Sequence, residues 1–422
     1  MSEKIFELDS SAIIYPFVAT EEITHGYTME ADIDEMVDVD ILKQAADNVC
    51  SRFPSLFVAL KKVKRGYALK HEKCGSAFVM PRPDFINGAF SVKEGEKLIR
   101  IIYKANRVGI EVFHIVTDGY GAIVLLKSLL GEYFRLKGEI IPNECGVFSP
   151  DELPSEKELE DSFKAHYRKE HGTESRSAKY AFMPYNENGF EHWHYTELLM
   201  NAAELKAVAK QNNATMTEFV SALYLYSFYE MREKKGSKKP ISIAVPMNLR
   251  SMFASETLRN FTLFFFAGVP EGEVTFETIL ERVKKDFKSG MDKDVIQRMI
   301  NINVAQQSML IFRILPRVMK KLVLNIGFRL YGEKLYTSTL SNLGVFKIPD
   351  ELDKHILAFR AVLGPVPINT IHSTMYCSKG IFGITFTSRL AGREIENKMK
   401  ELLQQQGIKS TLRDEEALLP IT

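Results

Sequence analysis

The chain has 422 residues, which exceeds one ordinary hydrophobic core and suits two domains of roughly 200 residues each. Its composition, 45% hydrophobic and 26% charged, excludes a disordered or fibrous protein. A formal net charge of +1 excludes a field of one sign over the whole molecule, so the charge gives no reason to expect a nucleic-acid partner.

The cysteine pattern and the N-terminal residues indicate in which cellular compartment the protein is expected. The four cysteines form no Cys-x-x-Cys pair and have no spacing that suits zinc. The N-terminus lacks the charged-then-apolar order of a signal peptide, and no stretch approaches the ~20 apolar residues of a membrane-spanning helix. We therefore expect a cytoplasmic protein with free thiols and no metal, in which the glycosylation sequons at Asn213 and Asn260 are chance matches.

The first half of the chain predicts short strands alternating with helices. Apolar residues recur at helical spacing from 39 to 53, where Pro54 ends the helix. A second helix is expected at 123–134, with Gly138 as its stop. The expected strands form two pairs: 56–60 with 67–69 through a turn at Gly66, and 99–103 with 108–114 through a turn at 105–107.

The second half repeats this mixture. Residues 142–188 are charged, polar and interrupted by prolines, so we expect a crossover between domains there, with one helix at 156–169. The strands expected beyond it are 191–196, 241–245, 261–267, 337–340, 356–362, 374–376 and 381–387, with 241–245 and 261–267 as inner strands. The helices expected are 202–211, 217–233, further helical segments up to 336, and 394–405.

Residues 310–331 combine apolar side chains with cations. Such a segment can lie on an anionic membrane surface, but a basic amphipathic helix is more often a solvated face over a core, and we favour that interpretation. The cations are Arg313, Arg317, Lys320, Lys321 and Arg329.

The most informative motif lies where a predicted strand runs into a helix. Residues 113–121 contain His-x-x-x-Asp-Gly at His114, Asp118 and Gly119, for which composition gives about 0.03 expected chance matches. Histidine, with an ordinary pKa of ~6.5, can accept a proton at pH 7 and return it. Gly119 permits a tight turn and close approach of a ligand, while a buried Asp118 requires an arginine that would fix the loop. We therefore favour a catalytic His114 over a buried structural histidine.

These residues resemble the chloramphenicol-acetyltransferase-like (CAT-like) superfamily of CoA-dependent acyltransferases, and most nearly its condensation-like alcohol acetyltransferases. Residues 113–121 match the superfamily's active-site motif, with Phe113 where condensation domains carry a first histidine. Residues 245–250 resemble the strand ending in Asn-x-Arg, and 339–344 resemble a Ser-Asn-Leu-Gly segment. The Asp-Phe-Gly-Trp-Gly signature of the plant branch is absent. Shorter resemblances lie at 8–9, 14–16, 52–54 and 380–388.

The resemblance implies an α/β fold, an α+β two-layer sandwich, with two CAT-like domains and an active-site tunnel between them. The expected parts are an N-terminal domain at 1–172 with the motif, a crossover linker at 173–190 and a C-terminal domain at 191–422. It also implies that acyl-CoA is the donor, that Asp118 pairs with Arg250, and that His114 is the general base. The Gly119 N–H, Ser341 and Asn342 are candidate oxyanion donors or tunnel residues, although Ser341 and Asn342 are explained equally well as turn formers.

Other functional motifs are incomplete. Gly119-x-Gly121 lacks the third glycine of a dinucleotide loop, and the chain has neither a phosphate-binding Lys-Ser/Thr loop nor a Gly-x-Ser-x-Gly elbow. His192 and His194 share a strand face but lack a third metal ligand.

Two classes of function remain. The first is an acyltransferase that moves an acyl group, most simply acetyl, from acyl-CoA to the hydroxyl or amine of a small or lipid-like acceptor. The second is a condensation-type protein supplied by a carrier-protein thioester, or a non-catalytic binding module on the same fold. The intact set of His114, Asp118, Gly119 and Arg250 favours the first class.

Overall fold

The computed structural model describes residues 4–21, 23–83, 86–169, 180–185, 190–272, 274–308, 315–365 and 369–419. Most of the linker predicted at 173–190 lies outside these ranges. Helices and strands are both abundant, which confirms the α/β class. No helix in the described ranges has both the length and the apolar character needed to span a bilayer.

The first half of the chain contains most of the expected elements. Its elements are β1 (Ile5–Glu7), η1 (Ala12–Ile14), α1 (Tyr15–Val18), β2 (Gly26–Ile33), α2 (Val39–Cys50), β3 (Val58–Val63), β4 (Gly66–His71), η2 (Ser76–Phe78), β5 (Val79–Pro81), β6 (Ile99–Lys104), β7 (Arg107–Phe113), α3 (Gly119–Leu136), α4 (Glu156–Leu159) and α5 (Ser162–Ala165). The side chain of Asp38 caps α2 by accepting from two backbone N–H groups, and Gly138 follows α3 with a φ of 96°.

The second half contains longer helices and a larger sheet. Its elements are β8 (Phe190–Asn201), α6 (Ala202–Gln211), α7 (Met216–Lys234), β9 (Ser242–Asn248), α8 (Arg250–Phe253), β10 (Thr262–Gly268), α9 (Phe276–Gly290), α10 (Lys293–Ser308), α12 (Arg317–Tyr331), η3 (Glu333–Leu335), β11 (Ser338–Val345), α13 (Asp350–Asp353), β12 (Ile356–Leu363), β13 (Ile371–Ser378), β14 (Ile381–Leu390), α14 (Glu394–Gln405) and β15 (Ser410–Leu419).

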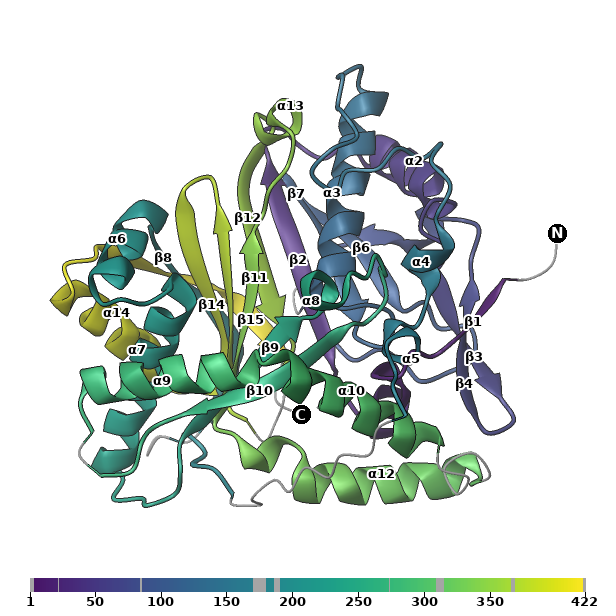
Figure 1. Cartoon of the computed structure of the whole chain (residues 1–422). Coiled ribbons are helices and arrows are strands. Elements are labelled where there is room, and N and C mark those ends of the chain that lie inside the picture. Colours follow the sequence, from purple (N-terminus) through teal and green to yellow (C-terminus); the bar gives the residue numbers. More distant parts are fainter. Residues whose placement is uncertain are drawn as a thin grey trace.

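The strands form three sheets. A five-stranded sheet has the order β12-β2-β7-β6-β5, a three-stranded sheet has β1-β4-β3, and a seven-stranded sheet has β10-β9-β11-β13-β14-β8-β15. Helices α2 and α3 lie beside the first of these, and α6, α7 and α14 lie beside the last, while α12 runs along the lower edge in Figure 1. Each large sheet is packed into its own hydrophobic core, and the two cores are separate clusters.

One strand crosses between the two halves of the chain. β12, which lies within the predicted C-terminal domain, pairs antiparallel with β2 from Leu363 opposite Tyr27 to Ile356 opposite Ile33. It thereby completes the sheet that carries the motif strand β7. The domain boundaries stay a prediction. The five-stranded sheet contains strands from both predicted domains.

Two expectations about single elements were wrong, and the strand β2 was missed. The helix expected at 156–169 is two single turns, α4 and α5, because Glu160 is extended and the side chain of Asp161 starts a new turn. β10 is an edge strand of the seven-stranded sheet and not an inner one, and its Phe264 is 39% exposed. β2 was not predicted, although its apolar residues alternate with Thr28, Glu30 and Asp32 at the period of a strand.

Candidate active site

His114 follows the last residue of β7 and lies in the loop before α3. Its backbone N–H donates to the carbonyl of His25 at 3.0 Å, which ties the loop to the start of β2. The ring of Tyr15 stacks on the imidazole with centroids 5.3 Å apart, and Tyr27 contacts it edge-on at 5.2 Å. The phenol of Tyr27 in turn donates to the carbonyl of Thr117 at 2.9 Å. Two aromatic rings therefore fix the orientation of the histidine.

A hydrogen bond to Asn260 selects the tautomer of His114. The amide nitrogen of Asn260 donates to the Asp9 carboxylate at 2.9 Å and to the backbone carbonyl of His114 at 3.0 Å. Its amide oxygen must then be the atom that lies 3.0 Å from Nδ1 of His114. Because that oxygen can only accept, Nδ1 carries the proton and Nε2 carries the lone pair.

Asp9 anchors this chain of hydrogen bonds from the N-terminal segment. The carboxylate is fully buried, and its second oxygen accepts from the Ser11 hydroxyl and from the Ala12 N–H, both at 2.9 Å. Burial raises the pKa of the Asp9 carboxyl above its ordinary value, while the positive charge of Arg259 opposes the rise. Asn260 carries no functional signal in the sequence beyond a sequon, and only the short resemblance at 8–9 included Asp9.

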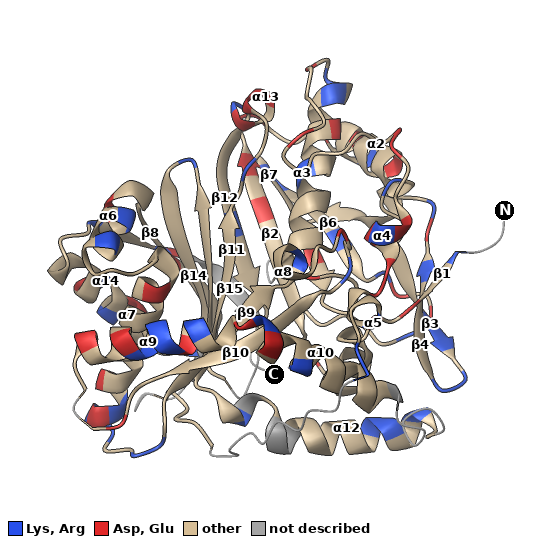
Figure 2. Cartoon of the chain, viewed as in Figure 1, with Lys and Arg blue, Asp and Glu red and all other residues tan. Residues whose placement is uncertain are grey.

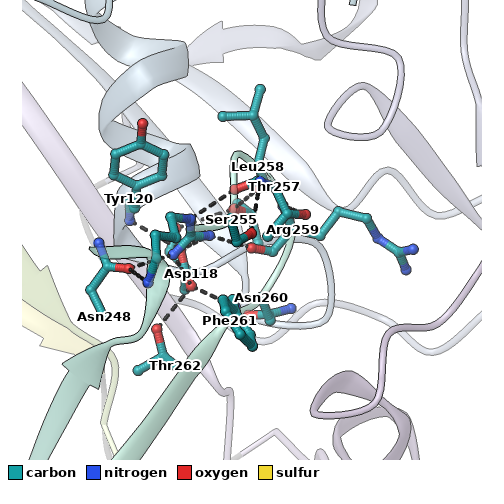
Figure 3. Close-up of polar contacts among 12 residues, drawn as sticks. Asp118, Tyr120, Asn248, Ser255, Thr257, Leu258, Arg259, Asn260, Phe261 and Thr262 are labelled. Carbon is teal, nitrogen blue, oxygen red and sulfur yellow. Dashed lines mark hydrogen bonds and ion pairs between the residues drawn. The ribbon is translucent and has the colours of Figure 1, made fainter. Parts of the chain in front are cut away.

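Asp118 and Arg250 form the predicted ion pair. The pair is bidentate, at 2.9 and 3.0 Å, and both residues are buried. Figure 3 shows Asp118 enclosed by the segment after α8, where the Phe261 N–H and the Thr262 hydroxyl each donate to it at 2.8 Å. Burial alone would raise the pKa of this carboxyl, but Arg250 and the two hydrogen bonds outweigh it and hold the pKa below its ordinary value.

All five N–H donors of Arg250 have partners. Besides Asp118, the guanidinium donates to the carbonyls of Thr257 (2.8 Å) and Arg259 (2.6 Å) and to the amide oxygen of Asn248 (3.0 Å). The same carboxylate caps α3 by accepting from the Tyr120 N–H. One ion pair therefore joins the motif loop of the first half to the loop between β9 and β10, which also carries Asn260.

The two glycines of the motif differ in how tightly they are enclosed. A Cβ on Gly119 would meet the end of the flexible Leu343 side chain at 2.7 Å. A Cβ on Gly121 would lie 2.2 Å from the backbone carbonyl of Leu258 and 2.2 Å from Oγ1 of Thr117. A close approach was predicted for Gly119, but the structure leaves less space for a side chain at Gly121 than at Gly119.

Gly121→Ala is expected to lower the free energy of unfolding by about 1–3 kcal/mol or more, because backbone atoms must move apart. Urea denaturation measures the change. Gly66→Ala is the matched control, since no atom lies within 4 Å of a Cβ there, and it should stay within about 0.5 kcal/mol. Equal stabilities of the two variants would contradict the close approach at Gly121.

A cavity of ≈ 1290 Å³ lies next to His114. It is larger than the ~300–1,000 Å³ typical of a single small ligand, so it has room for two reactants. Apolar side chains from both halves of the chain form much of its wall. These include Ile13, Tyr15, Phe17, Ile123, Leu263, Phe264, Phe266, Leu324, Phe328, Leu335 and Leu343.

His25 adds a polar group to this wall. Its Nε2 is buried and has no hydrogen-bond partner among the described residues. Burial, with a smaller effect of His114, lowers the pKa of His25 to about 3, so the ring is neutral. Its ring packs edge-on against Phe328 of α12.

The two predicted residues of β11 occupy different surroundings. Strands β9 and β11 pair over only Ser338 and Thr339, and both strands continue along the cavity beyond that point. Ser341 lines the cavity and is half-buried. Asn342 lines it too, but its amide donates to the Thr217 hydroxyl and accepts from the Gly344 N–H, each at 2.8 Å. Asn342 therefore holds the turn through its amide oxygen, and one of its two amide N–H groups is bonded to Thr217.

Within the described ranges, no three His, Cys, Asp or Glu side chains are grouped as a metal would require. The side chain of His192 lies outside the described residues.

Comparisons with known proteins give a result only at the level of structure. No protein-family model matches the sequence, and no curated protein matches it. Polyketide synthase associated protein 5 from Mycobacterium tuberculosis superposes with a TM-score of 0.59 at 13% identity, over 96% of this chain and 98% of that one. TRI101 from Fusarium sporotrichioides, solved with coenzyme A and T-2, gives 0.59 at 10% identity over 97% and 99%.

The condensation domain of the monacolin K polyketide synthase MokA is similar as well. Its TM-score is 0.57 at 12% identity, over 96% of this chain and 97% of that one. At such identities the likeness establishes the fold, and the high coverage of both chains shows that the whole chain shares it.

Proposed function

We propose, from the CAT-like fold that this chain shares with the condensation and acyltransferase superfamily, that it transfers an acyl group from a thioester to a hydroxyl or amine. The family resemblance of the sequence motifs is confirmed at the level of the fold. The observation that carries the proposed activity is the hydrogen bond from Nδ1 of His114 to Asn260, because it leaves the basic Nε2 beside the cavity.

His114 acts as general base in this proposal. Its Nε2 has no partner among the described residues, and the ring lines the cavity. Nε2 takes the proton of the acceptor hydroxyl as the oxygen attacks the thioester carbon, and a tetrahedral oxyanion forms. Its collapse breaks the carbon–sulfur bond, and the departing thiolate receives the proton from Nε2. The products are an ester and a free thiol, or an amide when the acceptor is an amine.

Donors to the oxyanion come from the two sides of the cavity. The first N–H of α3, at Gly119, has no intrahelical acceptor and lies at the positive end of the helix dipole. The Ser341 hydroxyl is the stronger side-chain candidate, because the amide of Asn342 is already bonded. Such a donor typically contributes ~10²–10³ in turnover.

The cavity suits the acyl-pantetheine arm of a donor. Among its described lining residues, Lys320 is the only lysine or arginine. These residues therefore offer the phosphates of CoA no second lysine or arginine. TRI101, one of the similar structures, was solved with coenzyme A, which supports free acyl-CoA as donor. A carrier protein presents the same arm, and the similar condensation domain keeps this donor as the second candidate.

The test is thiol release from acetyl-CoA and longer acyl-CoAs across a panel of alcohols and amines, with the same acyl groups on a carrier protein in parallel. We expect acceptor-dependent release from the CoA thioesters. Thiol release only from the carrier-protein thioesters would instead indicate a condensation-type function. Acyl-CoA binding without release from either donor would overturn the catalytic proposal in favour of a binding module.

Asn260 is a positioning residue in this proposal. Asn260→Ala removes the acceptor that holds the proton on Nδ1, so the unproductive tautomer becomes populated. We expect kcat to fall by about 10–100-fold, part of the ~10²–10⁴ that a general base supplies, while KM for the acceptor changes little. Steady-state kinetics with a saturating donor measures both. A rise in KM with unchanged kcat would instead assign Asn260 to substrate binding.

A further inference from the structure

Helix α12 presents an apolar face to the outside of the molecule. Five large side chains on its outer side are 49–81% exposed. At about 100° of rotation per residue they fall within an arc of roughly 140°, so they form one continuous face. They are Val318, Met319, Leu322, Val323 and Ile326, which together are called the α12 face below.

Positive charges border this face. By the same rotation, Lys320 lies at one edge of the α12 face and Lys321 at the other, each about 60° from the nearest apolar residue. The sequence contains no Asp or Glu between Asp294 and Glu333. Figure 2 accordingly shows blue and no red along α12. The surroundings of the face are thus cationic, although the whole chain is nearly neutral.

Residues that flank the α12 face, and residues on the opposite side of the helix, contact the protein. Asn325 donates to the Phe17 carbonyl of α1 at 2.8 Å, and Lys320 donates to the Arg65 carbonyl at 2.7 Å. Leu324 and Phe328 line the cavity beside His114. The helix therefore has apolar residues on both sides, because Leu324 and Phe328 face the cavity while the α12 face points outwards.

We infer that the α12 face docks on an anionic lipid surface, with its apolar residues among the acyl chains and Lys321 near the phosphate groups. An apolar face bordered by cations, with no acidic residue along the helix, has the charge complementarity of such a surface. Under the proposed function, the docked helix brings the cavity wall to the bilayer, which favours a substrate with an apolar chain.

Vesicle co-sedimentation of the full chain tests the inference without any substrate, so its result is independent of the proposed catalysis. The probes are vesicles of phosphatidylcholine alone, and of phosphatidylcholine with about one third phosphatidylserine. We expect binding to the second kind at low salt, weakened by added salt because exposed charges are screened. No binding to the anionic vesicles, or equal binding to both kinds, would overturn the inference.

Two substitutions separate the apolar and charged contributions. Leu322→Glu should reduce vesicle binding about 10-fold or more, and Lys321→Glu should reduce it in a salt-dependent way. Leu153→Glu is the matched control, because Leu153 is 89% exposed in the loop after α3, and it should bind as the parent does. Unchanged binding by Leu322→Glu would reject the α12 face as the docking surface.

The same variants test whether a second copy of the chain, and not a lipid surface, covers the α12 face. Sedimentation velocity should give the same oligomeric state for the parent and for Leu322→Glu. A parent dimer that Leu322→Glu converts to monomers would assign the α12 face to self-association and overturn the lipid proposal. Since Leu322 is 63% exposed, its substitution should leave the melting temperature unchanged, which circular dichroism checks.

Discussion

The His114→Ala protein is expected to lose about 10²–10⁴-fold in kcat for acyl transfer while keeping its fold. Alanine removes Nε2, the only proton acceptor that the proposed reaction uses at the acceptor hydroxyl. The ring of His114 contributes one side-chain hydrogen bond, to Asn260, whereas the loop is held mainly by Asp118 and Arg250. Thiol release at saturating donor and acceptor measures the loss, and thermal unfolding measures the fold.

A control substitution at another histidine distinguishes loss of the proposed base from a general effect of replacing histidine by alanine. His71 lies at the end of β4, bonds the Phe57 carbonyl at 3.1 Å and does not line the cavity. His71→Ala should therefore retain the parent turnover. If His114→Ala keeps turnover within a few-fold of the parent, the base is another group and the proposed mechanism fails.

Breaking the ion pair between Asp118 and Arg250 is expected to produce the largest loss of stability in the site. Arg250→Met leaves a buried carboxylate without its counter-charge, and Asp118→Asn leaves a buried guanidinium. Removing one partner of a buried pair typically costs ~3–5 kcal/mol. Because the two residues interact, the double variant should be less destabilised than the sum of the single variants by about 0.5–3 kcal/mol. Urea denaturation of all four proteins measures this coupling.

An exposed ion pair supplies the control. Lys157 of α4 and Glu256 of the loop between β9 and β10 lie 3.7 Å apart, with side chains 72% and 59% exposed. Lys157→Met and Glu256→Gln should each stay within about 0.5 kcal/mol of the parent. Simple additivity of the Asp118 and Arg250 substitutions would contradict their coupling.

The stability lost in Asp118→Asn should depend on pH in a defined direction. The pKa of Asp118 is lower in the folded protein than its ordinary value of 3.8, so the folded state favours the ionised carboxylate. This contribution is fully present above the ordinary value and disappears as the pH falls through the folded-state pKa. The difference between parent and Asp118→Asn should thus be constant near neutrality and shrink below about pH 4. A difference that grows in acid would contradict the assignment.

The sequence located the motif because its parts are local. His114, Asp118 and Gly119 fall within six residues at a junction between a strand and a helix, and periodicity identifies both elements. α6 and α14 occupy the predicted ranges 202–211 and 394–405, since helical spacing repeats over several turns. Arg250 was found by resemblance to a motif, because nothing in the sequence alone pairs it with a residue 132 positions away.

The buried strand β2 escaped prediction. β2 is buried yet carries Glu30, whose carboxylate accepts from Arg82 at 2.6 Å. The apolar residues of β2 alternate with polar ones at the period of a strand, so a lack of periodicity does not explain why it was missed. That pattern does not indicate the burial of both faces, because distant partners satisfy the charges of the polar face. The position of β12 in the first sheet and of β10 at the edge of another depends on pairing between strands, which periodicity within a strand does not encode.

The sequence by itself determined the α/β class, most helices and the local His-x-x-x-Asp-Gly motif, because short-range periodicity and a local pattern carry that information. Only the tertiary structure decided which residues surround His114. Asn260 and Asp9 reach it from segments 146 and 105 residues away, and they fix its tautomer through hydrogen bonds that no local pattern specifies. The outward apolar face of α12 was decided in the same way, since packing against α1 and the cavity, and not the composition of the helix, sets which side meets the solvent.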